Sequence, residues 1–429
     1  MPTFASLWLI CALALLPGFG WAVETTLEVG YRLSHSDNSN RSSVDPISEW
    51  IQEPNASVTV NHEGPNISAN GAYRFARIFY EENSRDEEPN HSGKVNLTWH
   101  ALPNRLDFVV QNTTTMNTIN SARANSPENR QLTNTFSAGP TVLWRGFRPG
   151  DETRLNYRYT VNTNDRTNTD SVRQSTSIDY IVPLSPRRSV TTTLQYEDVD
   201  FDNDLSPDYE FVSGVLRYNA SGDDLDINLS GGWKFIDRAD DFDDLDGFIT
   251  DSSLTWKLSA VSSWSFGYRR DAGDRSTQTR RGIPEFGEEF RDRTDINELF
   301  VYNNFTSTYS RSFGRTDFSL SGFYRDIDYE EDIESDEESW GGAILVSRQL
   351  TRSISARLRG SAERIDFVDE NREDDIYRYD FELNWNAARR LRLALGTSYE
   401  DRESDNLGAD YDEFVYYIGL YYMVLGPGR

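Results

Sequence analysis

Residues 414–424 read FVYYIGLYYMV, and every second residue of this stretch belongs to one apolar face. A repeat of two residues places successive side chains on opposite faces of a β-strand. The stretch therefore predicts a strand of about ten residues with one face in an apolar environment. The members of that face are Phe414, Tyr416, Ile418, Leu420, Tyr422 and Val424.

The same repeat recurs upstream, where residues 154–161, 225–235 and 391–400 alternate apolar with polar side chains. Segments of about ten residues are long enough to cross a bilayer as tilted β-strands. After the N-terminal segment, no stretch has the roughly 18 consecutive apolar residues that a transmembrane helix needs. Any membrane crossing is therefore predicted to use β-strands.

Two kinds of connection alternate between the predicted strands, and this alternation is typical of a barrel with short periplasmic turns and long extracellular loops. We predict an all-β fold, a transmembrane antiparallel up-and-down β-barrel of about 20 strands, with 18 as the alternative. An even count places both termini in the periplasm. The short connections are 63–66, 102–104, 184–187, 221–223, 260–262, 313–315 and 387–389, and the long acidic ones are 201–208, 237–246, 271–294, 328–337 and 401–410.

Tryptophans fall near both kinds of connection, which predicts an aromatic girdle at each membrane interface. A soluble array of β-sandwiches is the alternative, but it would need neither an export signal nor two alternating lengths of connection. Trp99, Trp144, Trp264 and Trp385 lie near short turns, and Trp50, Trp233 and Trp340 lie near long loops.

The composition is polar and acidic, with 37% hydrophobic residues, 26% charged residues and a formal net charge of -27. Such values alone would fit a disordered chain, but 22 Tyr, 23 Phe and 10 Trp are too many for a chain that buries nothing. A barrel reconciles the two observations, because only one face of each strand meets lipid. Nucleic acid is not expected as a partner, because the acidic charge would repel phosphate.

The N-terminus resembles an export signal. Residues 7–16 (LWLICALALL) have the length of a signal-peptide apolar region, and Gly20 and Ala22 are small residues at suitable cleavage positions. No Lys or Arg precedes the run, which departs from the usual pattern. We predict a signal peptide at 1–22 and a barrel at 23–429. Cys11, the single cysteine, would be lost with the signal, leaving no disulfide in the oxidising periplasm.

No catalytic, cofactor or metal site is predicted, and the chain is not expected to be an enzyme. The sequence has neither a G-x-S-x-G elbow nor an H-E-x-x-H pair. Its four histidines, His35, His62, His91 and His100, are interpreted as surface residues. The acidic run at 240–247 fails as a calcium loop, because the motif would begin at Phe242 and close at Ser253. Divalent cations could still bridge such loops to lipopolysaccharide phosphates.

Alternation predicts a lumen of mixed charge. A barrel of this strand number encloses an aqueous channel unless it is plugged. Such a lining suits a neutral or weakly charged polar polymer, although simple hydration of a wide barrel would explain it too. The loop at 271–294 is long enough to fold inward as a constriction. The predicted lumenal residues are Arg154, Arg158, Arg217, Lys257, Arg269, Arg325, Arg357, Arg359, Arg378 and Arg392, with Asp107, Asp226, Asn228, Asp317, Asp380, Glu382, Asn384 and Glu400 between them.

Several segments resemble the PEP-CTERM system-associated outer-membrane proteins, which are β-barrel porins of exopolysaccharide export loci. These segments are 48–56 (SEWIQEPNA), 58–60 (VTV), 65–71 (PNISANG), 78–80 (IFY), the polar run 111–129 and residues 133–139. The resemblance implies a first loop that contains Trp50 and an outer-membrane pore for secreted polysaccharide. It also implies periplasmic export proteins as partners and no catalytic residues. The ending LGPGR departs from the terminal aromatic of many barrels.

The leading interpretation is an exopolysaccharide export channel in the outer membrane of a Gram-negative cell. The expected partners are lipid, lipopolysaccharide and the barrel assembly machinery. One alternative is a general or substrate-specific diffusion porin, which an inward loop and ladders of opposite charge would favour. Another is a structural sheath around a periplasmic partner such as a multihaem cytochrome, although the chain has no CxxCH motif of its own.

Overall fold

The computed structural model describes residues 24–82, 87–119, 126–167, 169–203, 206–239, 243–274, 299–330, 336–406 and 408–426. The predicted signal peptide at 1–22 and most of the loop at 271–294 lie outside these residues. Among them, no helix is long and apolar enough to cross a membrane. The one helical element there is a 3-10 turn, η1 (Pro127–Asn129).

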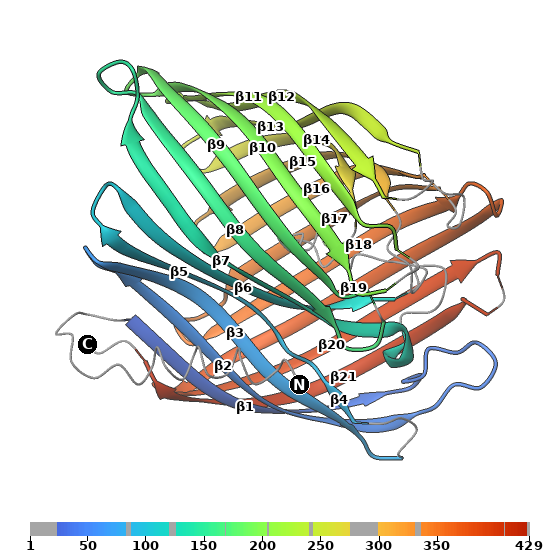
Figure 1. The fold of residues 1–429 in the computed structure, drawn as a ribbon. Helices are drawn as coiled ribbons and strands as arrows, with labels where there is room; N and C mark the ends of the chain where they lie inside the picture. Colours follow the sequence, from blue (N-terminus) through green and yellow to red (C-terminus); the bar gives the residue numbers. More distant parts are fainter. Residues whose placement is uncertain are drawn as a thin grey trace.

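The strands follow one another along the chain in a single series (Figure 1). They are β1 (Glu24–Ser36), β2 (Glu49–Glu63), β3 (Ile67–Tyr80), β4 (Glu88–Pro89), β5 (Ser92–Leu102), β6 (Leu106–Thr118), β7 (Arg130–Arg145), β8 (Glu152–Asn164), β9 (Ser171–Ser185), β10 (Arg188–Phe201), β11 (Tyr209–Ser221), β12 (Leu225–Arg238), β13 (Leu245–Ser259), β14 (Ser262–Gly273), β15 (Phe300–Phe313), β16 (Thr316–Tyr329), β17 (Glu337–Gln349), β18 (Ile354–Phe367), β19 (Arg372–Ala388), β20 (Leu391–Ser404) and β21 (Tyr411–Leu425).

Twenty of these strands form a closed antiparallel barrel, which confirms the predicted fold class. The short strand β4 lies beside β3 and does not enter the wall. Closure is made by β1 and β21, which pair from Ser36↔Val415 to Leu27↔Leu425. Closure gives the first and last strands of the sheet a hydrogen-bonded partner, as a membrane-spanning sheet requires.

Each strand turns one face outward and one inward. On β20 and β21 the outward side chains Leu395 and Ile418 lie directly opposite each other, and each is 50% exposed. Exposed apolar side chains of this kind gather over the whole outer wall, where lipid would cover them. The opposite face of the same strands carries Arg392 and Glu400. This period of two is the pattern that FVYYIGLYYMV predicts.

The two ends of the barrel differ in the length of their connections. One end has short turns, and Asn104 and Gly314 adopt positive φ angles of 59° and 62° in two of them. The other end has the longer loops, and the N-terminal end of β1 and the C-terminal end of β21 lie at the short-turn end. The predicted alternation is therefore present, and it identifies the short-turn end as periplasmic. One detail differs from expectation, because Trp50 lies in β2 rather than in the first loop.

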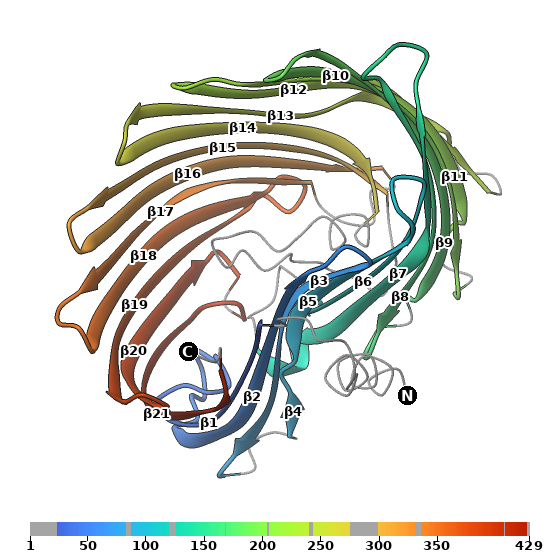
Figure 2. The same cartoon turned by 90° about the vertical axis from the view of Figure 1, so that its left-hand side faces the viewer.

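The wall opens locally between β13 and β14. Their pairing runs from Ser259↔Ser262 only as far as Thr250↔Arg270, and the last residues of β14 pair with β15 alone. Beyond Thr250, β13 continues in register with β12 up to Leu245. The free ends of β14 and β15 are thus able to leave the wall at the extracellular end, and Figure 2 shows that the barrel is not a regular cylinder.

Candidate functional site: the channel lumen

The sequence-predicted lumenal residues lie on the inward face of their strands. Register rows connect them, for example Arg357↔Glu382 and Arg359↔Asp380 between β18 and β19, and Arg378↔Glu400 between β19 and β20. A second row contains Arg217, Arg269, Asn304 and Arg325, from β11 to β16. Arg154, Arg158, Asp226, Asn228 and Lys257 share this face.

Tyr417 crosses a glycine to bind a carboxylate two strands away. Glu382, Gly396 and Tyr417 occupy one row across β19, β20 and β21. Because Gly396 has no side chain, the Tyr417 ring lies over its backbone, and the hydroxyl donates to Glu382 Oε2 at 2.7 Å. The other carboxylate oxygen of Glu382 accepts from Asn384 Nδ2 at 2.6 Å. Ring and carboxylate thereby fix each other against the wall.

A matching arrangement surrounds Tyr421. Its ring lies against the backbone of Gly30 and Gly419, and the Arg392 guanidinium carbon stands 3.9 Å from its centroid. Arg392 also donates to Asn384 Oδ1 at 2.9 Å and pairs with Glu28 Oε1 at 2.7 Å. Arg392 therefore connects β19 to β1 across the closure of the barrel, with its charge neutralised in place.

Alanine at position 396 should test whether the Tyr417 ring needs a glycine beneath it. A Cβ there would overlap the Tyr417 ring, so Gly396→Ala should displace the ring and break its bond to Glu382. We expect the free energy of unfolding to fall by about 1–3 kcal/mol, as for other overpacked sites. Urea unfolding in lipid vesicles would measure it. Gly247→Ala is the matched control, because no atom lies within 4 Å of a Cβ at that position. Equal stability of the two variants would argue against a packed ring.

Further charge networks lie near the extracellular end. Glu400 accepts from Tyr411 Oη at 2.5 Å and pairs with Arg378 Nε at 3.1 Å and with Arg41 at 3.5 Å. Arg41 also pairs with Glu413 at 2.9 Å. Because Arg41 belongs to the β1–β2 loop, these pairs attach that loop to the inner wall. Of the set, alternation predicted only Arg378 and Glu400.

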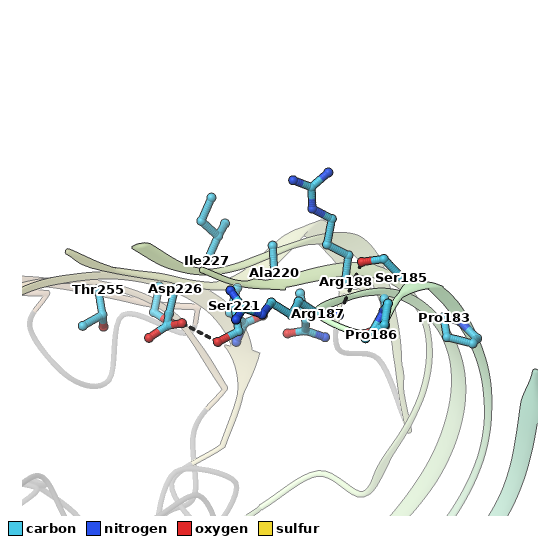
Figure 3. A pocket seen from close by; sticks show the side chains of 14 residues that line it. Pro183, Ser185, Pro186, Arg187, Arg188, Ala220, Ser221, Asp226, Ile227 and Thr255 are labelled. Atoms are coloured by element: carbon cyan, nitrogen blue, oxygen red, sulfur yellow. Dashed lines mark hydrogen bonds between the residues drawn. The ribbon is translucent and has the colours of Figure 1, made fainter. Parts of the chain in front are cut away.

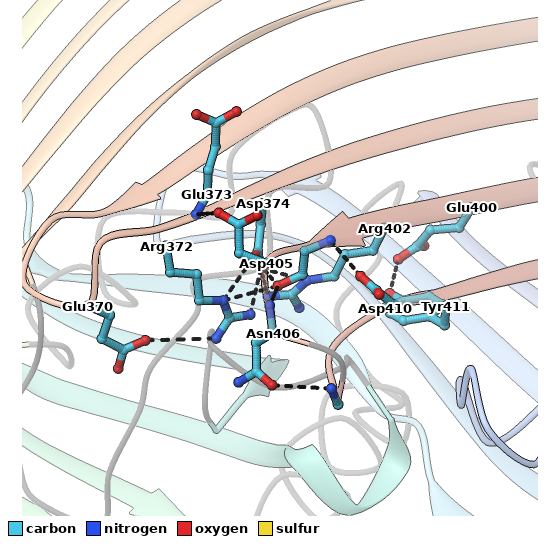
Figure 4. A network of polar contacts seen from close by, with 12 residues as sticks. Glu370, Arg372, Glu373, Asp374, Glu400, Arg402, Asp405, Asn406, Asp410 and Tyr411 are labelled. Atoms are coloured by element: carbon cyan, nitrogen blue, oxygen red, sulfur yellow. Dashed lines mark hydrogen bonds and ion pairs between the residues drawn. The ribbon is translucent and has the colours of Figure 1, made fainter.

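Asp374 is the centre of a neighbouring network (Figure 4). Its carboxylate accepts from Arg372 Nε at 2.9 Å and from Arg402 Nε at 2.9 Å, and Ser404 donates its hydroxyl to it. The Asp374 side chain is fully buried, and those of Arg372 and Arg402 are 5% and 2% exposed. Two buried guanidinium groups thus share this carboxylate.

The end of β14 and the start of β15 pack against the inner wall rather than continuing it. We call residues 271–274 and 299–302 the β14–β15 tip. Lys234 on β12 donates to Asp271 Oδ1 at 2.7 Å and to the Ala272 carbonyl at 2.6 Å. Ala272 and Leu299 pack with the inward side chains of β10, β11 and β12, which are Val199, Phe201, Tyr209, Phe211 and Ile236.

Arg173 on β9 forms the most distant attachment of this tip. It pairs with Asp274, with Glu197 at 3.4 Å, and with the Tyr209 hydroxyl at 3.2 Å. Arg173 and Asp274 are fully buried, and Glu197 is 1% exposed. A contact between β9 and β14 passes four intervening strands, so it lies inside the barrel. The described start of the predicted inward loop therefore narrows the lumen at its extracellular end, and its remainder lies outside the described residues.

The acidic loops owe much of their aspartate content to the closing of hairpins. In five hairpins the aspartate directly before the second strand accepts from the last backbone N–H of the first strand. The donor–acceptor pairs are Asn164–Asp170 at 2.7 Å, Phe201–Asp208 at 2.7 Å, Arg238–Asp244 at 3.4 Å, Tyr329–Asp336 at 2.8 Å and Ser404–Asp410 at 2.6 Å. Burial raises the pKa of Asp170, while the Asn164 bond opposes that rise.

Among the described residues, no group of three or more His, Cys, Asp or Glu side chains is arranged to hold a metal ion. His100 Nδ1 contacts an Asp107 carboxylate oxygen at 2.8 Å. This contact joins a histidine predicted at the surface to an aspartate predicted in the lumen. Burial lowers the pKa of the His91 imidazole, and Arg77 lowers it further. Both effects favour the neutral form of the His91 imidazole.

A shallow recess lies at the periplasmic rim, between the turns that follow β9 and β11 (Figure 3). Asp226 there accepts from Ser221 at 2.6 Å and pairs with Lys257 at 2.7 Å. Ile227 and Arg188 also line the recess, with side chains on the opposite side of the wall from that of Asp226. The recess is open and is formed by the ends of strands. The lumen is therefore the better candidate for the functional site.

Comparison with known proteins agrees with this architecture. Residues 341–423, which span β17 to β21, match the family model described as Putative beta-barrel porin 2. No curated protein matches the sequence significantly. The fold is similar to the siderophore receptor PirA from Pseudomonas aeruginosa, with 12% identity and a TM-score of 0.51 over 94% of this chain and 80% of that one.

The FrpB iron transporter from Neisseria meningitidis is similar at 10% identity and a TM-score of 0.50, over 96% of this chain and 83% of that one. Such low identities show a shared fold and nothing of the cargo. With its apolar outer wall, the chain is thus an outer-membrane β-barrel, and its location is the outer membrane of a Gram-negative cell.

Proposed function

We propose that the protein is an outer-membrane channel that passes exopolysaccharide, without a catalytic role of its own. The observation that carries this proposal is the inner wall of β19, β20, β21 and β1, where side-chain hydrogen bonds and ion pairs join neighbouring strands. Several charges in that wall are neutralised by a neighbouring strand, as in the Arg392–Glu28 and Arg378–Glu400 pairs. A wall of this kind offers many donors and acceptors to sugar hydroxyls without a strong field of one sign.

The resemblance of residues 48–71 to PEP-CTERM-associated barrels supports the same cargo. It also supports periplasmic polysaccharide export proteins as partners. Lipopolysaccharide and the barrel assembly machinery complete the proposed set of partners, since every outer-membrane barrel must insert and contact the outer leaflet.

A second candidate is a substrate-specific diffusion porin that takes small polar solutes inward. The docked β14–β15 tip favours it, because a segment that narrows the lumen would limit the size of the solute. In this reading the Lys234–Asp271 and Arg173–Asp274 pairs set the width of the extracellular entrance.

Single-channel conductance in planar bilayers, with neutral dextran fragments of graded length added from each side, would test the proposal. An export channel should show conductance that long fragments block from the periplasmic side. A size-limited porin should instead be blocked only by short fragments. Conductance that no fragment affects would contradict the polysaccharide proposal. Deletion in the native cell should then reduce the polysaccharide that is secreted.

A further inference from the structure

Arg32 on β1 is a lumenal cation held on an aromatic support. Its guanidinium carbon stands 3.8 Å from the centroid of the Tyr417 ring. The other side of that ring lies over Gly396, and its hydroxyl is bound to Glu382. The ring is therefore fixed against the wall, and the Arg32 guanidinium lies over this fixed ring as a cation–π contact.

The carboxylates near Arg32 are already engaged. Glu53 lies directly opposite it on β2 but pairs with Arg74, and Glu382 binds Tyr417 and Asn384. Within the described part of the chain, Arg32 forms no ion pair, and its Nε is buried without a hydrogen-bond partner. A buried donor without an acceptor costs free energy, so an acceptor from a ligand would be favoured.

Arg392 provides an internal comparison. It stacks on Tyr421 at 3.9 Å, much as Arg32 stacks on Tyr417, but Glu28 neutralises it at 2.7 Å. The two stacks lie side by side on the same inner wall, but Arg392 has both the Glu28 carboxylate and the Asn384 amide oxygen as partners. Glu28 neutralises Arg392, whereas no described carboxylate forms an ion pair with Arg32.

The net negative charge of the whole chain is not the charge of the lumenal wall, because many of the carboxylates lie elsewhere. Outward carboxylates face one another across neighbouring strands near the extracellular ends, as in Asp198↔Glu210, Asp326↔Glu338 and Asp375↔Glu403. These groups lie outside the barrel, and the wall shields the lumen from part of their field. A net charge of -27 is thus compatible with a cation that attracts anions inside.

We propose that Arg32 is the anion-binding group of a lumenal subsite for acidic saccharides. The subsite takes a carboxylate or phosphate group of the sugar. Tyr417 cannot stack on a sugar ring, because a glycine backbone covers one face and a guanidinium the other. Arg32 as a whole is only half-buried, and no described residue accepts a hydrogen bond from its terminal nitrogens, so these nitrogens are the groups that a ligand can reach. A guanidinium binds such anions with two parallel hydrogen bonds. This inference rests on the proposed channel function and narrows its cargo to polymers that carry spaced acidic groups.

The test compares trigalacturonate with the neutral maltotriose and with inorganic phosphate, as blockers of the channel and as ligands in calorimetry. The variants are Arg32→Gln, which removes the charge, and Arg32→Lys, which keeps the charge but loses the fork. Arg311→Gln is the matched control, because Arg311 is on the outward face of β15 and stacks on Phe313 at 5.8 Å. Calorimetry on the full protein in detergent does not depend on conductance. Failure of the channel proposal can therefore be distinguished from failure of the Arg32 subsite.

We expect trigalacturonate to bind at least about tenfold more tightly than maltotriose, and Arg32→Gln to remove most of that difference, since hydrogen bonds to a charged group are lost. Arg32→Lys should retain part of it, and Arg311→Gln should match the wild type. Binding of phosphate as tight as that of trigalacturonate would make this a small-anion site and overturn the saccharide assignment. Equal binding of trigalacturonate by wild type and Arg32→Gln would overturn the subsite itself.

Discussion

Replacing Arg173 with alanine should release the β14–β15 tip and raise the single-channel conductance. The substitution leaves Glu197 and Asp274 together in a buried site without their cation. Removing one partner from a buried ion pair costs about 3–5 kcal/mol. A change of that size would shift the docking equilibrium of the tip by more than roughly a hundredfold. The Lys234–Asp271 pair and the apolar contacts of Leu299 oppose release of the tip. We therefore expect the tip to be less firmly docked in the variant, while the barrel wall stays folded.

Conductance in planar bilayers and hydrogen exchange of the amides at 271–273 would measure this release. Arg187→Ala is the control, because Arg187 and Asp223 form an exposed pair at 2.7 Å, with side chains that are 63% and 85% exposed. An exposed pair contributes less than about 1 kcal/mol, so the control should leave both readings unchanged. Wild-type conductance and exchange in Arg173→Ala would mean that other contacts hold the tip.

The alternation of outward side chains could be predicted because lipid imposes it on every strand. Leu395 and Ile418 each meet the same apolar surroundings wherever they are on the barrel, so a local pattern is sufficient. The two kinds of connection follow from the same physics, since a chain that crosses and returns needs only a tight turn on the periplasmic side. Inward placement of Arg357 and Arg378 follows by elimination from the apolar face.

Contacts inside the lumen could not be predicted in this way. Arg173 and Asp274 are 101 positions apart, and their strands are separated by four others. Alternation says that both side chains can point inward, but it does not say that β14 leaves β13 and brings them together. The length of the loop at 271–294 suggested an inward fold, and the described residues 271–274 lie inside.

Two features of the sequence correspond to these contacts but have more than one interpretation. Tyr417 and Tyr421 occupy the second face of FVYYIGLYYMV, where a tyrosine counts as apolar although its hydroxyl can bind a lumenal carboxylate. Aspartates such as Asp208 and Asp410 directly precede strands, and this position marks the hairpin closure found here. Such loop aspartates are equally candidates for a cation bridge to lipopolysaccharide, because composition alone does not reveal a backbone N–H partner.

Removing the carboxylate of Asp374 should strongly destabilise the extracellular ends of β19 and β20. Asp374→Ala leaves the buried guanidinium groups of Arg372 and Arg402 without the carboxylate that they share. The expected loss in the free energy of unfolding is about 3–5 kcal/mol. Asp374→Asn should recover little of it, because an amide carries no charge and presents donors of its own to the two guanidinium groups.

Glu370→Gln is the control for this site, because Glu370 is 46% exposed and lies 3.9 Å from Arg372. Screening by water should keep its cost below about 1 kcal/mol. Urea unfolding in lipid vesicles would compare the variants, and hydrogen exchange would locate the change. Exchange should rise in the loops at 368–371 and 405–410 and stay unchanged at the periplasmic turns. If Asp374→Ala and Glu370→Gln unfolded alike, the two arginines would have to find other acceptors, and the network would be a consequence of the barrel rather than one of its supports.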